Sequence, residues 1–202
     1  LIFLPPILWA AAYGTSFRDF KANFRPIALL SVGLVLVTTA AVAIAAHALW
    51  PGMPWAVAVT LGAIVSPPDA VAAEAIITRL PVPRVVVSVL AGESLVNDAS
   101  ALTLYRTAVA AAVTGFFSPG EATVRFFVDA GIGVLLGLAV GWLVVRTVVL
   151  TRDPVADVLV GLIGPYVAWV AGETLHVSAV LACVAGGLYV RRATTLLHKL
   201  GE

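Results

Sequence analysis

Two polar motifs lie inside apolar stretches of this 202-residue chain: Ser66-Pro67-Pro68-Asp69 and Gly92-Glu93-Ser94-Leu95-Val96-Asn97-Asp98. A charged side chain near the middle of a bilayer costs roughly 2.5–3.5 kcal/mol on insertion scales, so intramembrane carboxylates mark ion pathways. Pro67 and Pro68 lack backbone N–H donors, and a broken helix is tolerated at membrane depth only where it lines a cavity. Together the motifs predict an ion-binding site inside a membrane transporter.

The second motif forms a polar strip on a predicted helix. At 100° per residue, Glu93 and Asn97 share one face, while Ser94 and Asp98 share the adjacent face. The strip offers oxygen ligands and one amide, which suit Na⁺, K⁺, Li⁺ or protons. Zinc is not expected, because no Cys or His lies near either motif. We therefore expect a monovalent-cation site and no cofactor.

The first motif supplies a complement to this strip. Where the helix breaks at Ser66-Pro67-Pro68, backbone carbonyls lose their usual donors and can coordinate a cation. Asp69 stands at the start of the resumed helix, where free N–H groups stabilise a carboxylate. Capping that helix and lining the ion site are compatible roles for Asp69, and both stay open.

Asp98, which we expect to be buried, is the candidate carrier of cation and proton. A carboxylate that holds either ion, but not both, is sufficient for exchange, because the arrival of one releases the other. A structural salt bridge with Arg106 is the competing role. Arg106 follows about two helical turns later on a similar face, is expected to be buried, and would need an acidic partner. Glu93 is the alternative partner of Arg106.

Composition excludes an ordinary soluble domain. Hydrophobic residues make up 61% of the chain and charged residues 11%, against about 25% charged in a typical soluble domain. The mean hydropathy is +1.05. A net charge of +1 without a basic stripe argues against a nucleic-acid partner. The single cysteine, Cys183, lies in an apolar segment, which predicts a packing role.

Spans of about 20 apolar residues indicate seven membrane segments in one transporter fragment of residues 1–202. All of the 12 Lys and Arg residues except Arg106 and Arg125 fall in alternate loops, which the positive-inside rule assigns to the cytoplasm. The chain begins at Leu1 within an apolar run, so we expect it to be part of a longer polytopic protein. The predicted segments are 1–13 (partial), 26–49, 55–78, 85–115, 123–145, 155–172 and 176–190.

Three glycines, Gly133, Gly137 and Gly141, recur at four-residue spacing in one segment. This spacing permits the close approach of another helix. Packing within the chain is the favoured interpretation, and a contact between subunits is the alternative.

Four stretches together carry a family resemblance: Leu4-Pro5-Pro6, Ser16-Phe17-Arg18-Asp19-Phe20, Gly62-Ala63-Ile64-Val65-Ser66-Pro67-Pro68-Asp69-Ala70-Val71-Ala72 and Gly92-Glu93-Ser94-Leu95-Val96-Asn97-Asp98-Ala99. They closely resemble bacterial sodium/proton antiporters of the monovalent cation:proton antiporter-1 family. The resemblance implies an inverted-repeat helical bundle with a core domain and a dimerisation domain, and a homodimer in the cell membrane. The third segment, broken at Pro67-Pro68, would be the first of two discontinuous helices, and the second would lie outside these residues.

The resemblance also implies site roles. Asp98 would bind cation and proton, with Asp69 and Ser94 lining the cation site. Asn97 stands where electrogenic relatives have a second aspartate, which implies electroneutral exchange of one cation for one proton. Glu93 would form a structural pair, in the family often with an arginine on a late helix, and Arg106 is a local alternative.

The predicted function is secondary active exchange of Na⁺, or of K⁺ or Li⁺, for protons, and not enzymatic catalysis. A passive cation channel is one alternative, although no symmetric filter motif is visible. A membrane-inserted fragment without transport activity is another. A membrane-embedded serine hydrolase would need a histidine near its nucleophile, and Ser94 has none close in sequence.

Overall fold

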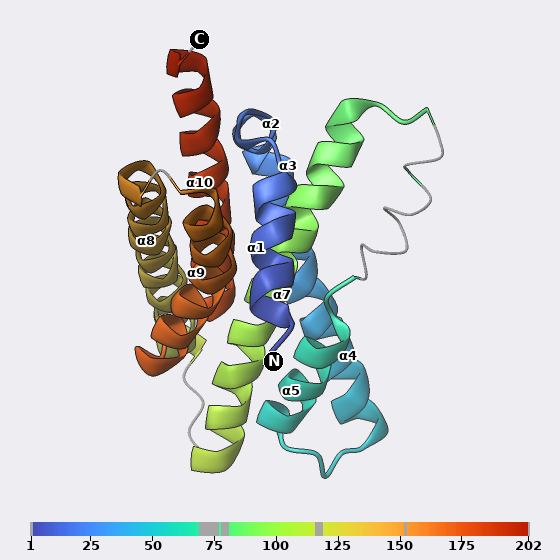
Figure 1. Ribbon diagram of the computed structural model, residues 1–202. Coiled ribbons are helices and arrows are strands. Elements are labelled where there is room, and N and C mark those ends of the chain that lie inside the picture. Colours follow the sequence, from blue (N-terminus) through green and yellow to red (C-terminus); the bar gives the residue numbers. More distant parts are fainter. Residues whose placement is uncertain (1, 69–76, 78–80, 116–118, 152, 202) are drawn as a thin grey trace. The chain divides into compact units, whose positions relative to one another are not determined.

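The computed structural model is built from helices, which confirms the all-α class (Figure 1). It describes residues 2–68, 77, 81–115, 119–151 and 153–201, and no strand occurs within these ranges. The helices in chain order are α1 (Leu4–Gly14), α2 (Phe17–Ala22), α3 (Phe24–Ala28), the π-helical η1 (Leu29–Leu34), α4 (Val35–Leu49), α5 (Trp55–Val65), α7 (Arg84–Thr114), α8 (Pro119–Thr151), α9 (Pro154–Thr174) and α10 (Ala179–Gly201).

Three helices of the described part are long and apolar enough to cross a membrane: Phe24–Leu49, which joins α3, η1 and α4, then Val85–Thr114 and Val124–Thr151. They coincide with the predicted segments 26–49, 85–115 and 123–145, although the last helix runs further. Helices α1 and α9 lie where 1–13 and 155–172 were expected. Helix α10 begins at Ala179 and extends beyond the predicted end at residue 190. The full set of seven spans stays a prediction.

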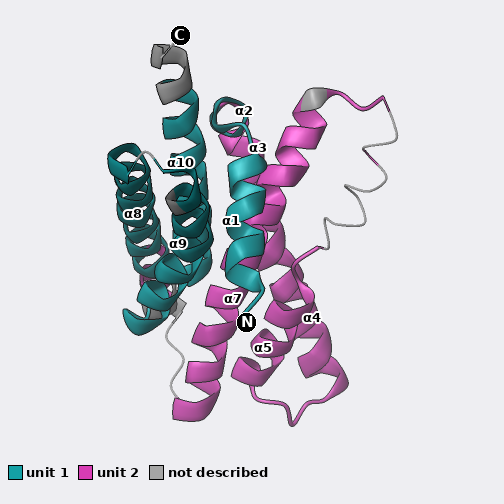
Figure 2. Cartoon of the chain, in the orientation of Figure 1, with its two compact units in different colours: residues 1–21, 128–202 teal, residues 22–127 magenta. Residues whose placement is uncertain are grey.

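The chain divides into two compact units (Figure 2). Unit 1 contains residues 1–21 and 128–202, because α1 packs against α9 and α10. Unit 2 contains residues 22–127, in which α5 packs against both α4 and α7. Both polar motifs therefore belong to unit 2.

Helix α5 ends where the sequence requires it to end. The Ser66 N–H donates to the Gly62 carbonyl at 3.0 Å. The next two residues, Pro67 and Pro68, have no N–H with which to continue the ladder. The predicted end of the helix before Pro67 is confirmed. Asp69 and the start of the resumed helix lie outside the described residues.

Small residues hold unit 1 together. On α8, a Cβ added to Gly133 would lie 2.6 Å from the carbonyl of Ser178, the residue before α10. A Cβ added to Gly141 would lie 2.9 Å from the Gly186 carbonyl within α10. Gly137 faces the Ala182 carbonyl in the same way. Packing within the chain is thus confirmed for this stripe.

The packing role of Cys183 is confirmed as well. Its side chain is fully buried in α10, with Sγ 3.5 Å from the Pro165 carbonyl oxygen of α9. Gly186 and Gly164 leave space for the ring of Trp9, which inserts from α1. A single aromatic side chain therefore packs on two other helices of unit 1.

We expect Gly137→Val to destabilise the protein by about 1–3 kcal/mol, because the new side chain would overlap the α10 backbone. Thermal unfolding in detergent measures this change. Gly131→Val on the same helix is the matched control, because no atom lies within 4 Å of the position of its Cβ. Equal melting temperatures for the two variants would contradict the assignment of the α8–α10 contact.

Candidate ion site at the α5 break

Helix α7 carries the second motif and presents it on two faces. Glu93 and Asn97 are buried, with exposed fractions of 6% and 1%. Ser94 is half-buried and Asp98 is exposed. The division into two adjacent faces is confirmed, and burial shows that the Glu93–Asn97 face packs into unit 2. The prediction that Asp98 is buried is wrong for this structure.

One hydrogen bond joins the two motifs. The Asn97 Nδ2 group donates to the Pro68 carbonyl oxygen at 3.2 Å, across 29 positions of sequence. Pro68 lies beyond the end of α5, so its carbonyl has left the helical ladder. In an apolar surrounding such a carbonyl must find a donor elsewhere. An amide supplies this donor at every pH, whereas an ionised carboxylate cannot.

Glu93 and Asn97 each bring a buried oxygen atom to the same face of α7. Within the described part, neither Asn97 Oδ1 nor Glu93 Oε1 has a hydrogen-bond partner. An unsatisfied buried acceptor costs about 1–3 kcal/mol. Glu93 and Asn97 lie one helical turn apart, so a buried face beside the α5 break carries two acceptors. Oxygen atoms of this kind suit a monovalent cation or an ordered water molecule.

Arg106 is exposed, so the prediction of a buried arginine is wrong. Eight residues of helix rotate by about 80° net, which places Arg106 on the side of Asp98 rather than on the side of Asn97. That side faces away from the core of unit 2. Because Arg106 is exposed, it does not need a buried acidic partner such as Asp98 or Glu93, which the sequence had suggested.

Sequence reasoning missed two further buried polar residues of α7, Ser100 and Thr103. Their hydroxyls donate to the Val96 and Ala99 carbonyls at 3.0 and 2.8 Å. Ser100 follows Asn97 by three residues and Thr103 follows Ser100 by three, a helical spacing of small polar residues that was the available signal. Because their donors are satisfied within α7, they extend the polar face without adding unpaired donors.

The family model for "Sodium/hydrogen exchanger, transmembrane" matches residues 1–201. The chain belongs to this exchanger family. The resemblance drawn from the two motifs is therefore confirmed. With its long apolar helices, this exchanger-family chain is a multi-pass membrane protein, which in bacteria resides in the cell membrane.

Curated relatives of the exchanger-family chain carry transport names. It is 37% identical over 194 residues to a Bacillus subtilis "Sodium, potassium, lithium and rubidium/H(+) antiporter", covering 93% of this chain and 29% of the relative. It is 35% identical over 199 residues to an uncharacterised Na⁺/H⁺ exchanger of Escherichia coli, covering 96% and 36%. It is 30% identical over 188 residues to the Na⁺/H⁺ antiporter NhaS2 of Synechocystis, covering 93% and 35%. The chain thus spans about a third of the length of these relatives.

We expect Asn97→Asp to lower the free energy of unfolding by about 1–3 kcal/mol at neutral pH, because an ionised carboxylate leaves the Pro68 carbonyl without its donor. Thermal unfolding in detergent measures the change. Ser94→Ala, on the half-buried neighbouring face, is the control and should unfold as the wild type does. An unchanged melting temperature for Asn97→Asp would show that the bond to Pro68 contributes nothing.

Proposed function

We propose that the chain forms part of a secondary active antiporter that exchanges Na⁺ for protons. The hydrogen bond from Asn97 to the Pro68 carbonyl carries this proposal, because it brings a helix break and a carboxylate-bearing helix together at one place. Broken helices with free carbonyls are how transporters coordinate cations within the bilayer. The names of the relatives support the same class of activity.

Asp98 is proposed to bind cation and proton competitively. It follows Asn97, whose amide binds the Pro68 carbonyl, by one residue, and its side chain is exposed. Ser94, one turn earlier on the same face, and Asp69, after the α5 break, are proposed to line the cation site. Because one carboxylate exchanges one charge for another, each cycle would move one cation against one proton.

Glu93 and Arg106 are proposed to compensate charge around the site rather than to carry the ion. Glu93 is buried on the face that meets the α5 break, and one of its oxygen atoms has no partner in the described part. Arg106 lies on the side of Asp98 and contributes positive potential there. We further propose that the full-length transporter is a homodimer.

The range of cations is proposed to extend beyond Na⁺. The name of the Bacillus subtilis relative includes potassium, lithium and rubidium. A site of hydroxyl, amide, carboxylate and backbone oxygens has no intrinsic preference among these ions, so cavity size decides between them. K⁺ and Li⁺ are therefore the additional substrates to test.

Asp98→Asn should abolish exchange, lowering the initial rate by more than about tenfold, since the amide cannot bind a proton in competition with a cation. Everted vesicles containing the full-length transporter, an internal pH-sensitive dye and an imposed proton gradient measure the collapse of the gradient on addition of Na⁺, Li⁺ or K⁺. Asp153→Asn is the matched control, because asparagine replaces aspartate at a helix N-cap without loss. Cation-dependent collapse that persists in Asp98→Asn would refute the carrier role.

Exchange should proceed at the same rate whether or not a membrane potential is present. A potential imposed across the same vesicles with thiocyanate, a permeant anion, should leave the Na⁺-dependent rate within about 20% of its value without the potential, as one charge moves each way. A rate that follows the potential would show a net charge movement and would favour a channel or an electrogenic exchanger.

A further inference from the structure

Helices α4 and α5 are in backbone contact one turn before the α5 break. A Cβ added to Gly62 would lie 2.5 Å from the Thr39 carbonyl oxygen and 3.0 Å from the Thr39 Cα. Real Cβ atoms do not approach backbone this closely, and backbone atoms cannot rotate away as the end of a side chain can. Glycine at position 62 is therefore required by this approach rather than by its own backbone conformation.

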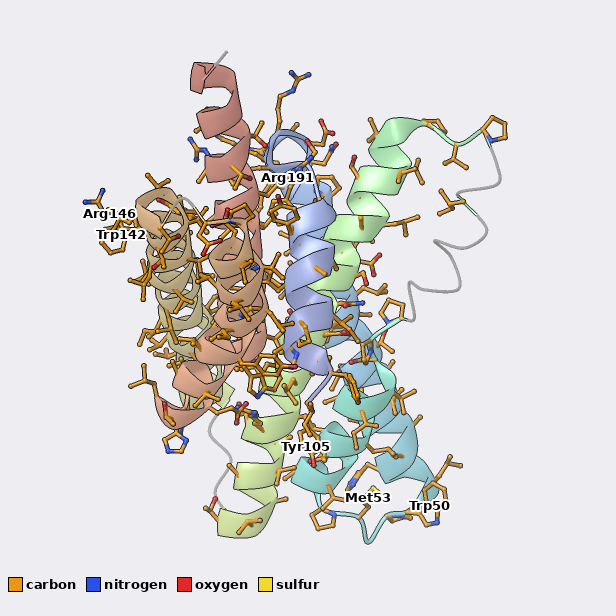
Figure 3. The ribbon with its side chains drawn as sticks, in the orientation of Figure 1. Trp50, Met53, Tyr105, Trp142, Arg146 and Arg191 are labelled. Atoms are coloured by element: carbon orange, nitrogen blue, oxygen red, sulfur yellow. The ribbon has the colours of Figure 1, made fainter. Side chains whose placement is uncertain are left out.

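The other end of the same helix pair is also fastened. Met53 and Trp50 lie in the turn that joins α4 to α5 (Figure 3). The His47 Nδ1–H donates to the Met53 carbonyl at 2.8 Å, and the His47 ring stacks on Trp55 at 4.2 Å. Ala43, Ala46 and Ala58 fill the space between the helices. Helix α5 is thus held against α4 from its first turn to Gly62.

The position of Gly62 along α5 connects this contact to the ion site. The Gly62 carbonyl accepts the last helical hydrogen bond, from the Ser66 N–H at 3.0 Å. Two residues after Ser66, the Pro68 carbonyl accepts the bond from Asn97. A shift of α5 at Gly62 would be passed through one turn of helix to the carbonyls of the break.

We propose that Gly62 is a positioning residue for the cation site: its backbone contact with Thr39 sets where the Ser66–Pro68 carbonyls stand relative to Asn97. The effect on transport rests on the proposed antiport function, whereas the effect on the Asn97–Pro68 bond does not. The role is indirect, since Gly62 itself has no side chain to offer to an ion.

The hydroxyl of Thr39 offers a second explanation for an effect of this contact on the cation site, and the experiment must distinguish it from the positioning role of Gly62. The Thr39 side chain is 3% exposed, and its Oγ1 has no hydrogen-bond partner within the described part of the chain. A hydroxyl of this kind could itself serve an ion or a water molecule. Thr39→Val removes the hydroxyl but keeps the backbone that Gly62 touches, so it distinguishes the two roles.

The transport experiment compares Gly62→Ala, Gly33→Ala and Thr39→Val in vesicles of the full-length transporter. Gly33→Ala is the matched control, because no atom lies within 4 Å of the position of its Cβ. We expect Gly62→Ala to raise the KM for Na⁺ about threefold to tenfold, the fold-change equivalent to one hydrogen bond, with little change in maximal rate. Gly33→Ala and Thr39→Val should keep the wild-type KM. An unchanged KM in Gly62→Ala, or an equal rise in Thr39→Val, would overturn the proposal.

A second measurement does not depend on transport. Melting temperatures are compared for Gly62→Ala, Asn97→Ala and the double variant in detergent. If Gly62 acts through the Asn97–Pro68 bond, the double variant loses less than the sum of the single losses, because the bond is lost only once. Additive losses would overturn the positioning role. Vesicles that show no cation-dependent exchange in the wild type would refute the proposed function, and this thermal cycle would still decide the role of Gly62.

Discussion

Unit 2 is organised around one constraint: backbone groups that lose their partners where a helix ends must be hydrogen-bonded elsewhere. Pro67 and Pro68 end α5 because neither can donate to the carbonyls of Ala63 and Ile64, four residues earlier, and the Pro68 carbonyl lies beyond the helix. In the membrane setting that the sequence predicts for this segment, no water would be available to satisfy them. The Asn97 amide reaches across from α7 and donates to the Pro68 carbonyl. The Asn97 amide thus ties the chain just beyond α5 to α7, while the close contact of α4 with α5 at Gly62 holds the last turn of α5 in place.

Both units use small residues where helices touch, but buried polar side chains lie almost entirely in unit 2. Unit 1 relies on glycine and alanine, whose absent or small side chains let α8 and α10 touch through their backbones. Unit 2 buries polar side chains, and most of its hydroxyls donate to a carbonyl one turn earlier in the same helix, which satisfies the donor at little cost. Within the described part of unit 2, the buried oxygen atoms without a hydrogen-bond partner belong to Thr39, Glu93 and Asn97. Of the buried polar side chains in the described part, all but Ser178 lie in unit 2: Ser31, Thr39, Ser66, Glu93, Asn97, Ser100 and Thr103.

Sequence reasoning found the end of α5, the two faces of the second motif and the packing of the α8 glycines, but it did not find which face of α7 meets the core. The end of α5 follows from two prolines, and the two faces of the second motif follow from 100° per residue. The same rotation does not say which face meets the core. We expected Asp98 and Arg106 to be buried because they are charges within an apolar helix. In the structure Asn97, Ser100 and Thr103 are buried, and Asp98 and Arg106 are exposed. The contact of Gly62 with Thr39 could not be predicted, because a single glycine in an apolar segment does not indicate which helix packs against it.

The choice of amide at position 97 and carboxylate at position 98 separates two tasks that a pair of carboxylates would combine. An amide donates through nitrogen and accepts through oxygen, and it keeps both properties at any pH. The bond from Asn97 to Pro68 can therefore persist through a transport cycle in which protons come and go. In the proposed mechanism, the change of charge belongs to Asp98, whose side chain is rotated by 100° and leaves the inward face. With a carboxylate at position 97, the attachment of α7 to the helix break would depend on that group being protonated, and every proton released would loosen the framework that positions the cation. Adjacent residues on one helix thus allow the ion site to change its charge while the hydrogen bond that supports it stays intact.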